Sequence, residues 1–260
     1  MTIINFIKKI KKTKSPIDLF FKITQRINTV LIFPKGGFTR YPIDIFMKKI
    51  SHDIFSEMKV LDVGAGDKPY QKLFKGCSYE SCDHEIISKE TSAAKNTDHS
   101  FYCDITQKIP KPDNYYDLII CNEVLEHLNE PYLALKEFHR ILRPEGKLVV
   151  TAPQCHGLHQ EPYNYFNYLS YGLEYLFKKA KFTNIEITPL GGIFHLLGKV
   201  LNNSVGILLF RKSIIGKLLF YPIELLVKII LYLLSILLFY LDYFDKEKKW
   251  TIHYGCVCKK

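Results

Sequence analysis

The 260-residue sequence lacks the cysteine and histidine patterns of disulfide-linked or metal-bound proteins. Its seven cysteines have no paired spacing before Cys256-x-Cys258, which is too close for a typical metal knuckle, and its histidines have no zinc-ligand spacing. We therefore expect no metal site. Because most of the thiols lie in apolar segments, the sequence favours a reducing, cytoplasmic compartment. It also has no internal repeat, no low-complexity linker and no signal-peptide core with a cleavage site.

Acidic residues are absent from the first fourteen positions, which five lysines share with isoleucines and a phenylalanine. On a helix this composition gives one basic and one apolar face, which is typical of a segment lying on an anionic membrane surface. A solvated basic tail is the alternative. The net charge is +10, but the lysines are not mixed with arginines or stacking aromatics, so no nucleic acid is expected as a partner. Residues 1–40 are predicted to form a basic amphipathic helical segment.

The clearest motif is a short apolar run that ends in an acid and two glycines, KVLDVGAGD at residues 59–67. Such a run predicts a buried parallel strand, and its glycines let the following turn bring bare backbone against a small ligand. A dinucleotide fingerprint begins in the same way, but Pro69 stands where its third glycine would be. This proline disfavours a helix that opens tightly on a pyrophosphate.

Four further segments follow in order: YESCD at 79–83, FYCDI at 101–105, YDLIICNEVLEH at 116–127 and LRPEGKLVVTAP at 142–153. With the glycine motif, they resemble the class I S-adenosylmethionine-dependent methyltransferases. The resemblance is to the type 11 group, and to its members in bacterial surface-polysaccharide gene clusters. It implies an α/β fold with a seven-stranded Rossmann-like sheet, mostly parallel with an antiparallel last strand, and helices on both faces. The methyltransferase domain is expected to occupy residues 41–260.

The resemblance also implies a binding site for S-adenosylmethionine. Asp83 is expected to bind the ribose, because a carboxylate at the C-terminal end of a strand can accept hydrogen bonds from both ribose hydroxyls. Asp104 and the backbone amide of Ile105 are expected near the adenine. The full set of residues expected at the cofactor is Asp62, Gly64, Ala65, Gly66, Asp83, Asp104, Ile105, Asn122 and Glu123.

The loop at 154–168, QCHGLHQEPYNYFNY, is the best candidate for acceptor chemistry, because open α/β sheets bind ligands beyond the C-terminal ends of their strands. Its resemblance to the polysaccharide-cluster enzymes includes His159 and Glu161. Histidine has the ordinary pKa for removing a hydroxyl proton near neutral pH. We therefore expect His159 to be the catalytic base, with Glu161 orienting it or binding the acceptor. His127 is an alternative base, and a purely structural role of the loop residues is the other interpretation.

The tract Leu218–Leu241 is the most apolar in the chain, interrupted in charge only by Glu224 and Lys228. It lies in an apolar helical insert expected at about 193–247. Its uncharged part would cover only about 20 Å as a helix. Because 251–258 is expected to return as the last strand of the same sheet, a single membrane crossing is disfavoured. We expect an in-plane or shallowly embedded helix, with a hairpin to Ile207–Leu219 as one form, or else a soluble insert packed on itself.

The sequence thus predicts an S-adenosylmethionine-dependent methyltransferase, peripheral to the inner face of the cytoplasmic membrane. Its expected acceptor is a small-molecule or lipid-linked glycan, or a lipid intermediate, methylated on oxygen, and an anionic membrane surface is its expected partner. Two alternatives stay open. The pattern at 122–127 also resembles quinone-type and other small-molecule methyltransferases, and a non-catalytic membrane adaptor would retain the same fold.

Overall fold

The computed structural model describes residues 37–85, 98–208 and 214–260. The chain divides into two compact units, Met1–Asp44 and Ile45–Lys260. Helix α3 (Gly37–Ser51) contains the boundary between them. Of the basic segment predicted at 1–40, all but the last four residues lie outside the described residues.

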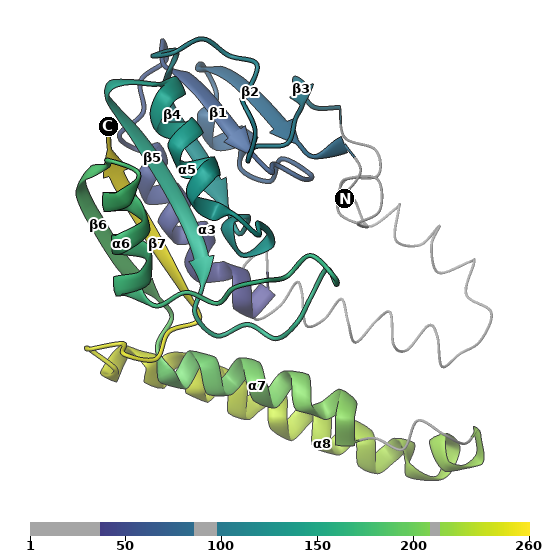
Figure 1. Ribbon diagram of the computed structural model, residues 1–260. Coiled ribbons are helices and arrows are strands. Elements are labelled where there is room, and N and C mark those ends of the chain that lie inside the picture. Colours follow the sequence, from purple (N-terminus) through teal and green to yellow (C-terminus); the bar gives the residue numbers. More distant parts are fainter. Residues whose placement is uncertain (1–36, 86–97, 209–213) are drawn as a thin grey trace. The chain divides into compact units, whose positions relative to one another are not determined.

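Seven strands form one sheet in the order β3-β2-β1-β4-β5-β7-β6 (Figure 1). The pairs β1 with β2, β1 with β4, β2 with β3 and β4 with β5 are parallel, while β7 is antiparallel to both β5 and β6. This confirms the predicted sheet and its antiparallel last strand. The strands are β1 (Lys59–Val63), β2 (Ser78–Asp83), β3 (Phe101–Tyr102), β4 (Tyr116–Asn122), β5 (Leu142–Pro153), β6 (Thr183–Leu190) and β7 (His253–Lys259).

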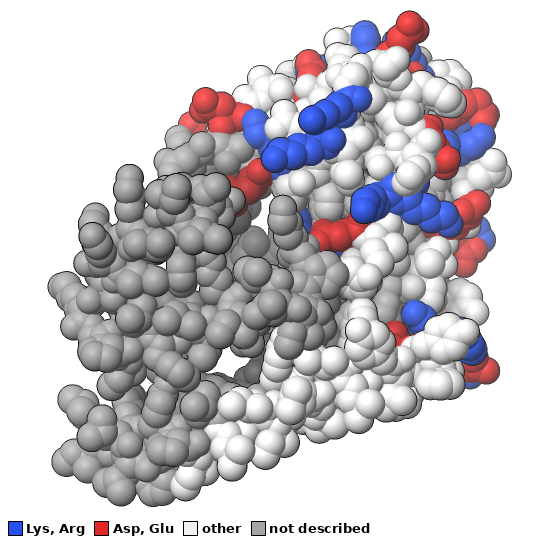
Figure 2. Space-filling model, turned by 180° about the vertical axis from the view of Figure 1, so that it is seen from behind, with Lys and Arg blue, Asp and Glu red and all other residues white. Residues whose placement is uncertain are grey.

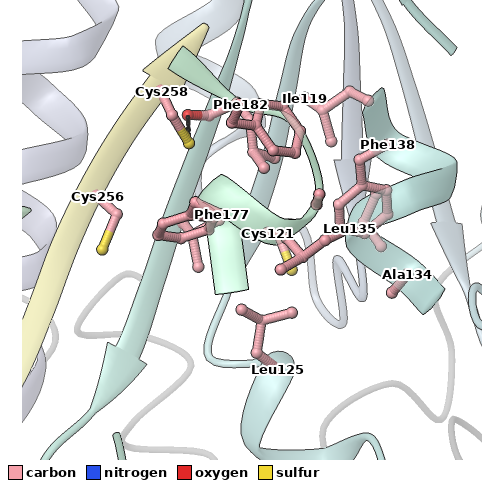
Figure 3. Packing of buried hydrophobic residues seen from close by; sticks show 14 of the residues in the cluster. Ile119, Cys121, Leu125, Ala134, Leu135, Phe138, Phe177, Phe182, Cys256 and Cys258 are labelled. Carbon is pink, nitrogen blue, oxygen red and sulfur yellow. Dashed lines mark hydrogen bonds between the residues drawn. The ribbon is translucent and has the colours of Figure 1, made fainter. Parts of the chain in front are cut away.

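The middle of the sheet is buried on both faces, as its nearly continuous apolar strands predict. Helices α5 (Pro131–Ile141) and α6 (Ser170–Lys179) cover one face. Figure 3 shows Phe138 of α5 and Phe177 of α6 in the same cluster as Ile119 and Cys121 of β4. The described residues also include three short 3₁₀ helices: η1 (Gln71–Phe74), η2 (Leu125–His127) and η3 (Asp242–Phe244).

The chain between β6 and β7 forms a hairpin of two helices, α7 (Ile193–Leu208) and α8 (Ile214–Leu241), which lie side by side (Figure 1). The partner of α8 is therefore α7 and not the expected segment Ile207–Leu219, whose residues from Ile214 onward belong to α8 itself. Asp242, directly after α8, accepts hydrogen bonds from the amides of Gly192 and His195 and so caps the start of α7.

The hairpin lies at the end of the sheet where the parallel strands finish (Figure 1). Ser235 of α8 donates a hydrogen bond to the carbonyl of Gly198 in α7, at 3.2 Å, which fixes the two helices against each other. Within the described ranges, no helix combines the length and the apolar composition needed to cross a membrane.

Candidate functional site

The turn after β1 is shaped by two glycines in the left-handed region, Gly64 at φ +60° and Gly66 at φ +50°. A Cβ atom on Gly64 would lie 2.5 Å from a methyl carbon of Val124, which follows β4. The turns after β1 and β4 therefore touch, and no side chain fits between them. A Cβ on Gly66 would meet nothing within 4 Å, so this backbone faces open space.

Asp83 stands at the end of β2 and is held against the glycine turn. One carboxylate oxygen accepts a hydrogen bond from the amide of Gly66 at 3.1 Å, and the other accepts one from the amide of His84 at 2.7 Å. The buried Nε2 of His99 lies 3.7 Å from the same carboxylate. Since a carboxylate has about four acceptor positions, Asp83 keeps capacity for further donors.

The other residues expected at the first three strands have more varied surroundings. Asp62 is buried and accepts a hydrogen bond from the hydroxyl of Tyr79 at 2.6 Å, so it braces β1 against β2. Burial and this carboxylate raise the pKa of Tyr79 well above its ordinary value. Asp104 is exposed and accepts hydrogen bonds from the amide and the hydroxyl of Thr106, at 2.9 Å and 2.7 Å, while Ile105 and Ala65 are buried.

Glu123 directly follows β4, in the left-handed region at φ +52°. One of its carboxylate oxygens lies 2.9 Å from Nδ1 of His253, the buried first residue of β7. Burial alone would raise the pKa of Glu123, but His253 and a hydrogen bond from Thr151 outweigh it and lower that pKa. The neighbouring Asn122 is also joined to Thr151, through a 3.4 Å contact between their side-chain oxygens. The ends of β4 and β5 and the start of β7 thus share one polar network.

Histidines extend this network into the loop after β5. The ring centroids of His156 and His159 are 4.3 Å apart, those of His127 and His159 are 4.9 Å apart, and those of His156 and His253 are 6.3 Å apart. Burial lowers the pKa values of His127 and His156. The sequence-predicted His127 and His159 are therefore brought together, and we call His127, His156, His159 and His253 the histidine cluster.

Glu161 does not join this cluster. It is exposed, and no ion pair joins it to His159 in the part of the chain that the structure describes. Nδ1 of His159 lies 3.0 Å from the carbonyl oxygen of Gly157, which orients the ring in place of a carboxylate. The orienting role expected for Glu161 thus has no supporting contact in the described residues, and its acceptor-binding role stays a prediction.

Helix α7 contributes a lysine that the sequence analysis did not single out. The ammonium of Lys199 donates a hydrogen bond to the carbonyl of Cys155 at 3.1 Å, and burial lowers its pKa to about 8. A lone lysine in an apolar helix was a detectable signal. His253 and Glu126 were also missed, and their signals were weaker. His253 lies in a mostly apolar strand, and Glu126 lies within the segment at 122–127 that was assigned by its resemblance to methyltransferases.

Comparisons with known proteins point to one family. Residues 61–150 match the family model described as a methyltransferase domain. A demethylmenaquinone methyltransferase of Renibacterium salmoninarum is 31% identical over 97 residues, covering 36% of this chain and 40% of its own. A ubiquinone/menaquinone biosynthesis C-methyltransferase of Paraburkholderia xenovorans is 42% identical over 103 residues, covering 35% and 42%. The chain spans less than half the length of these curated relatives.

Solved structures match over much more of the chain. A SAM-dependent methyltransferase from Archaeoglobus fulgidus has a TM-score of 0.53 at 15% identity, covering 85% of this chain and 94% of its own. Phosphoethanolamine N-methyltransferase 2 of Haemonchus contortus, in complex with S-adenosyl-L-methionine, has a TM-score of 0.50 at 16% identity, covering 96% and 59%. At such identities the likeness shows a common fold.

Proposed function

We propose that this chain, which belongs to the class I S-adenosylmethionine-dependent methyltransferase family, methylates an oxygen of a membrane-held acceptor. The acceptor class is a glycan, a lipid-linked sugar or a lipid intermediate, and the enzyme works at the inner face of the cytoplasmic membrane. The observation that carries the proposal is an exposed apolar helix face on the same hairpin that contacts the histidine loop.

The turns after β1 and β2 fit the cofactor. Bare backbone at Gly66 faces open space, and the carboxylate of Asp83 is held beside it with acceptor capacity for two ribose hydroxyls. When bound, the cofactor supplies an electrophilic methyl group on a sulfonium. The chain must hold an acceptor oxygen in line with that methyl group and remove its proton.

The histidine cluster is suited to the proton-removal task. The Nδ1–H of His159 is directed at the carbonyl of Gly157, which leaves Nε2 as the nitrogen with a lone pair. His127 has the same arrangement, with Nδ1 at the carbonyl of Tyr163. Glu161, exposed on the same loop, is available to bind polar groups of an acceptor.

One face of α8 is apolar and exposed. Its members recur every three or four residues, which is the spacing of one helix face, and each is 53% to 68% exposed: Ile223, Leu226, Ile230, Leu233, Leu237 and Tyr240. We call this set the α8 face. In Figure 2 the described surface of the hairpin is an almost uncharged band, while charged side chains gather over the sheet. Contiguous apolar surface of this kind marks an interaction site.

The segment after α8 has the residues of a membrane interface. Tyr243, Phe244 and Trp250 are exposed, and Lys246 lies with its ammonium 3.7 Å from the ring centroid of Tyr243. Aromatic rings beside lysines are typical of the headgroup region of a bilayer. Since Lys199 links the same hairpin to the loop of His159, a lipid surface under α8 would bring lipid-linked acceptors to the cluster.

A quinone-type acceptor is the second candidate. It is favoured by the curated relatives named as menaquinone and ubiquinone methyltransferases, which match about a third of this chain. Quinones are also membrane lipids, so the α8 face suits both candidates. The chemistry differs from methylation at oxygen. One relative is named as a C-methyltransferase, and the name of the other gives a demethylated quinone as its acceptor.

The cofactor part of the proposal is tested by calorimetric titration with S-adenosylhomocysteine. Micromolar binding is expected for the full chain. Asp83→Ala should weaken it by about 10- to 100-fold, the range for hydrogen bonds to a charged group. Asp53→Ala, an exposed acid outside the site, is the matched control. Absence of binding by a folded sample would reject catalysis and support the adaptor alternative.

A further inference from the structure

We propose that Glu126, His127 and His159 bind one divalent transition-metal ion at the C-terminal edge of the sheet. One ligand atom from each of these residues lies within 4.8 Å of the other two. The set was not visible in the sequence, because Glu126 and His127 are adjacent while His159 lies in the next loop. The sequence expectation of no metal site considered spacing alone.

The two histidines are oriented as metal ligands are. Nδ1 of His127 faces the carbonyl of Tyr163, and Nδ1 of His159 faces the carbonyl of Gly157. Each ring therefore has its proton on Nδ1 and its lone pair on Nε2. Metal-binding histidines have this second hydrogen bond almost always, because it fixes the tautomer and the direction of the ring.

Glu126 supplies the independent observation that a cation belongs there. Its side chain is fully buried, and neither carboxylate oxygen has a hydrogen-bond partner in the described parts of the chain. Buried carboxylates are normally paired or coordinated to metals. One oxygen lies 3.8 Å from Nε2 of His127, which is too far for a hydrogen bond and leaves space for an ion to bridge them.

The separations are close to those of a metal site. For ligand atoms no more than 4.8 Å apart there is a point within about 2.8 Å of all three, and ligand distances of 2.0 to 2.2 Å need only small side-chain rotations. Two imidazoles and one carboxylate suit Zn²⁺, Fe²⁺ or Co²⁺ better than Mg²⁺ or Ca²⁺. Three protein ligands leave an open position, which is typical of catalytic metal sites.

The location gives the ion a role that rests on the proposed function. Val124, which touches the glycine turn, is two residues from Glu126, so an ion held by the three residues would lie near the proposed cofactor site. An acceptor hydroxyl bound there would lose its proton to water more readily, because a metal lowers its pKa. The oxygen then forms a bond to the methyl carbon as the carbon–sulfur bond breaks and the thioether leaves. His159 is a ligand in this account, rather than a free base.

The test is metal content and zinc affinity of the purified full chain. After removal of adventitious ions with a chelator, the protein should bind one equivalent of Zn²⁺, measured by calorimetry and by elemental analysis after gel filtration. Co²⁺ should give the visible absorption of a protein-bound ion. Glu126→Gln and His159→Ala should each weaken zinc binding by at least about 30-fold. His156→Ala, which changes a neighbouring imidazole outside the set, should keep one equivalent.

Titration with S-adenosylhomocysteine shows whether each variant is folded. A folded wild-type chain that binds no Zn²⁺, or variants that bind it as tightly as the wild type, would overturn the metal site. Such a chain could still transfer methyl groups, with His159 as base. A chain that binds zinc as predicted but transfers no methyl group would instead reject the proposed function and leave the metal site standing.

Discussion

Nδ1 of His253 lies 2.9 Å from a carboxylate oxygen of Glu123, although 129 positions separate them and the apolar hairpin lies between them in the chain. The contact exists because β7 is antiparallel to β5, so its first residue lies at the edge where the parallel strands end. Strand β7 therefore brings a buried histidine to the residues expected at the cofactor. The hairpin is attached at the same edge, which links the proposed membrane surface to the proposed chemistry.

The two glycines of the first turn should respond differently to alanine. Gly66→Ala puts a Cβ into open space. It should lower the free energy of unfolding by about 1 kcal/mol, the penalty for a non-glycine residue in the left-handed region. Gly64→Ala adds a clash with Val124. Overpacking of this kind should lower the free energy of unfolding by a further ~1–3 kcal/mol. Urea unfolding measures both. Val124→Ala in the Gly64→Ala background should restore part of the loss, and no restoration would contradict the described contact.

Lys199 should make stability depend on pH in the alkaline range. Its pKa falls from an ordinary 10.5 to about 8 on folding, because burial disfavours the ammonium. Between those two values the unfolded chain binds more protons than the folded chain, so the free energy of unfolding should rise with pH. The slope should reach at most about 1.4 kcal/mol per pH unit.

Lys199→Met tests this dependence, since it keeps an apolar stem and removes the titrating group. Relative to this variant, the wild-type chain should gain stability between pH 8 and 10 in urea unfolding. Parallel curves for the two proteins would show that Lys199 is not buried against the loop of Cys155.

Charge on the α8 face should release the protein from lipid. Leu233→Glu with Leu237→Glu places two carboxylates on this face, and should reduce flotation with anionic phosphatidylglycerol vesicles at least about tenfold. Binding of S-adenosylhomocysteine should not change, because neither residue reaches the cofactor turns. Leu133→Glu, on the exposed side of α5, is the matched control and should float like the wild type. Equal flotation of all three proteins would exclude the α8 face as a membrane contact.

Loop residues should separate chemistry from acceptor binding. His159→Ala should lower the turnover number by about 100-fold or more, because the variant loses the imidazole that either removes the acceptor proton or binds the proposed metal ion. Glu161→Gln should mainly raise the KM for a polar acceptor, since this side chain is exposed and forms no ion pair with His159 in the described part of the chain. Steady-state kinetics with both variants distinguish the two roles. A large fall in turnover for Glu161→Gln alone would reverse the assignment.

The strands and the glycine turn were predictable because their signals are local. An apolar run with a following acid and glycines defines β1 and its turn within nine residues, and an apolar run followed by Asn122 and Glu123 marks the end of β4. Asp83 could be named because it ends a strand at a familiar distance from the turn. Its bond to the amide of Gly66 follows from parallel pairing of β1 and β2.

The rest of the site depends on contacts between distant segments. Lys199 and His253 reach it only through the packing of α7 and the antiparallel return of β7, which no local pattern specifies. The prediction that Ile207–Leu219 would pair with α8 was wrong for the same reason. Apolar composition alone does not specify which of two apolar segments packs against a helix. Hydrogen bonding of His159 to Gly157, rather than to a carboxylate, likewise depends on the folded loop.

Transfer of a labelled methyl group tests the central claim most directly. Full-length protein, S-adenosylmethionine with a tritiated methyl group, and vesicles containing either lipid-linked sugars or quinol precursors would be incubated separately. We predict label in the lipid-linked sugars, as an ether that survives mild base, and its loss with Asp83→Ala. Label in the quinol precursors alone would contradict the glycan or lipid acceptor in favour of a quinone. Absence of label in both, from a protein that binds S-adenosylhomocysteine, would contradict membrane-held methyl transfer.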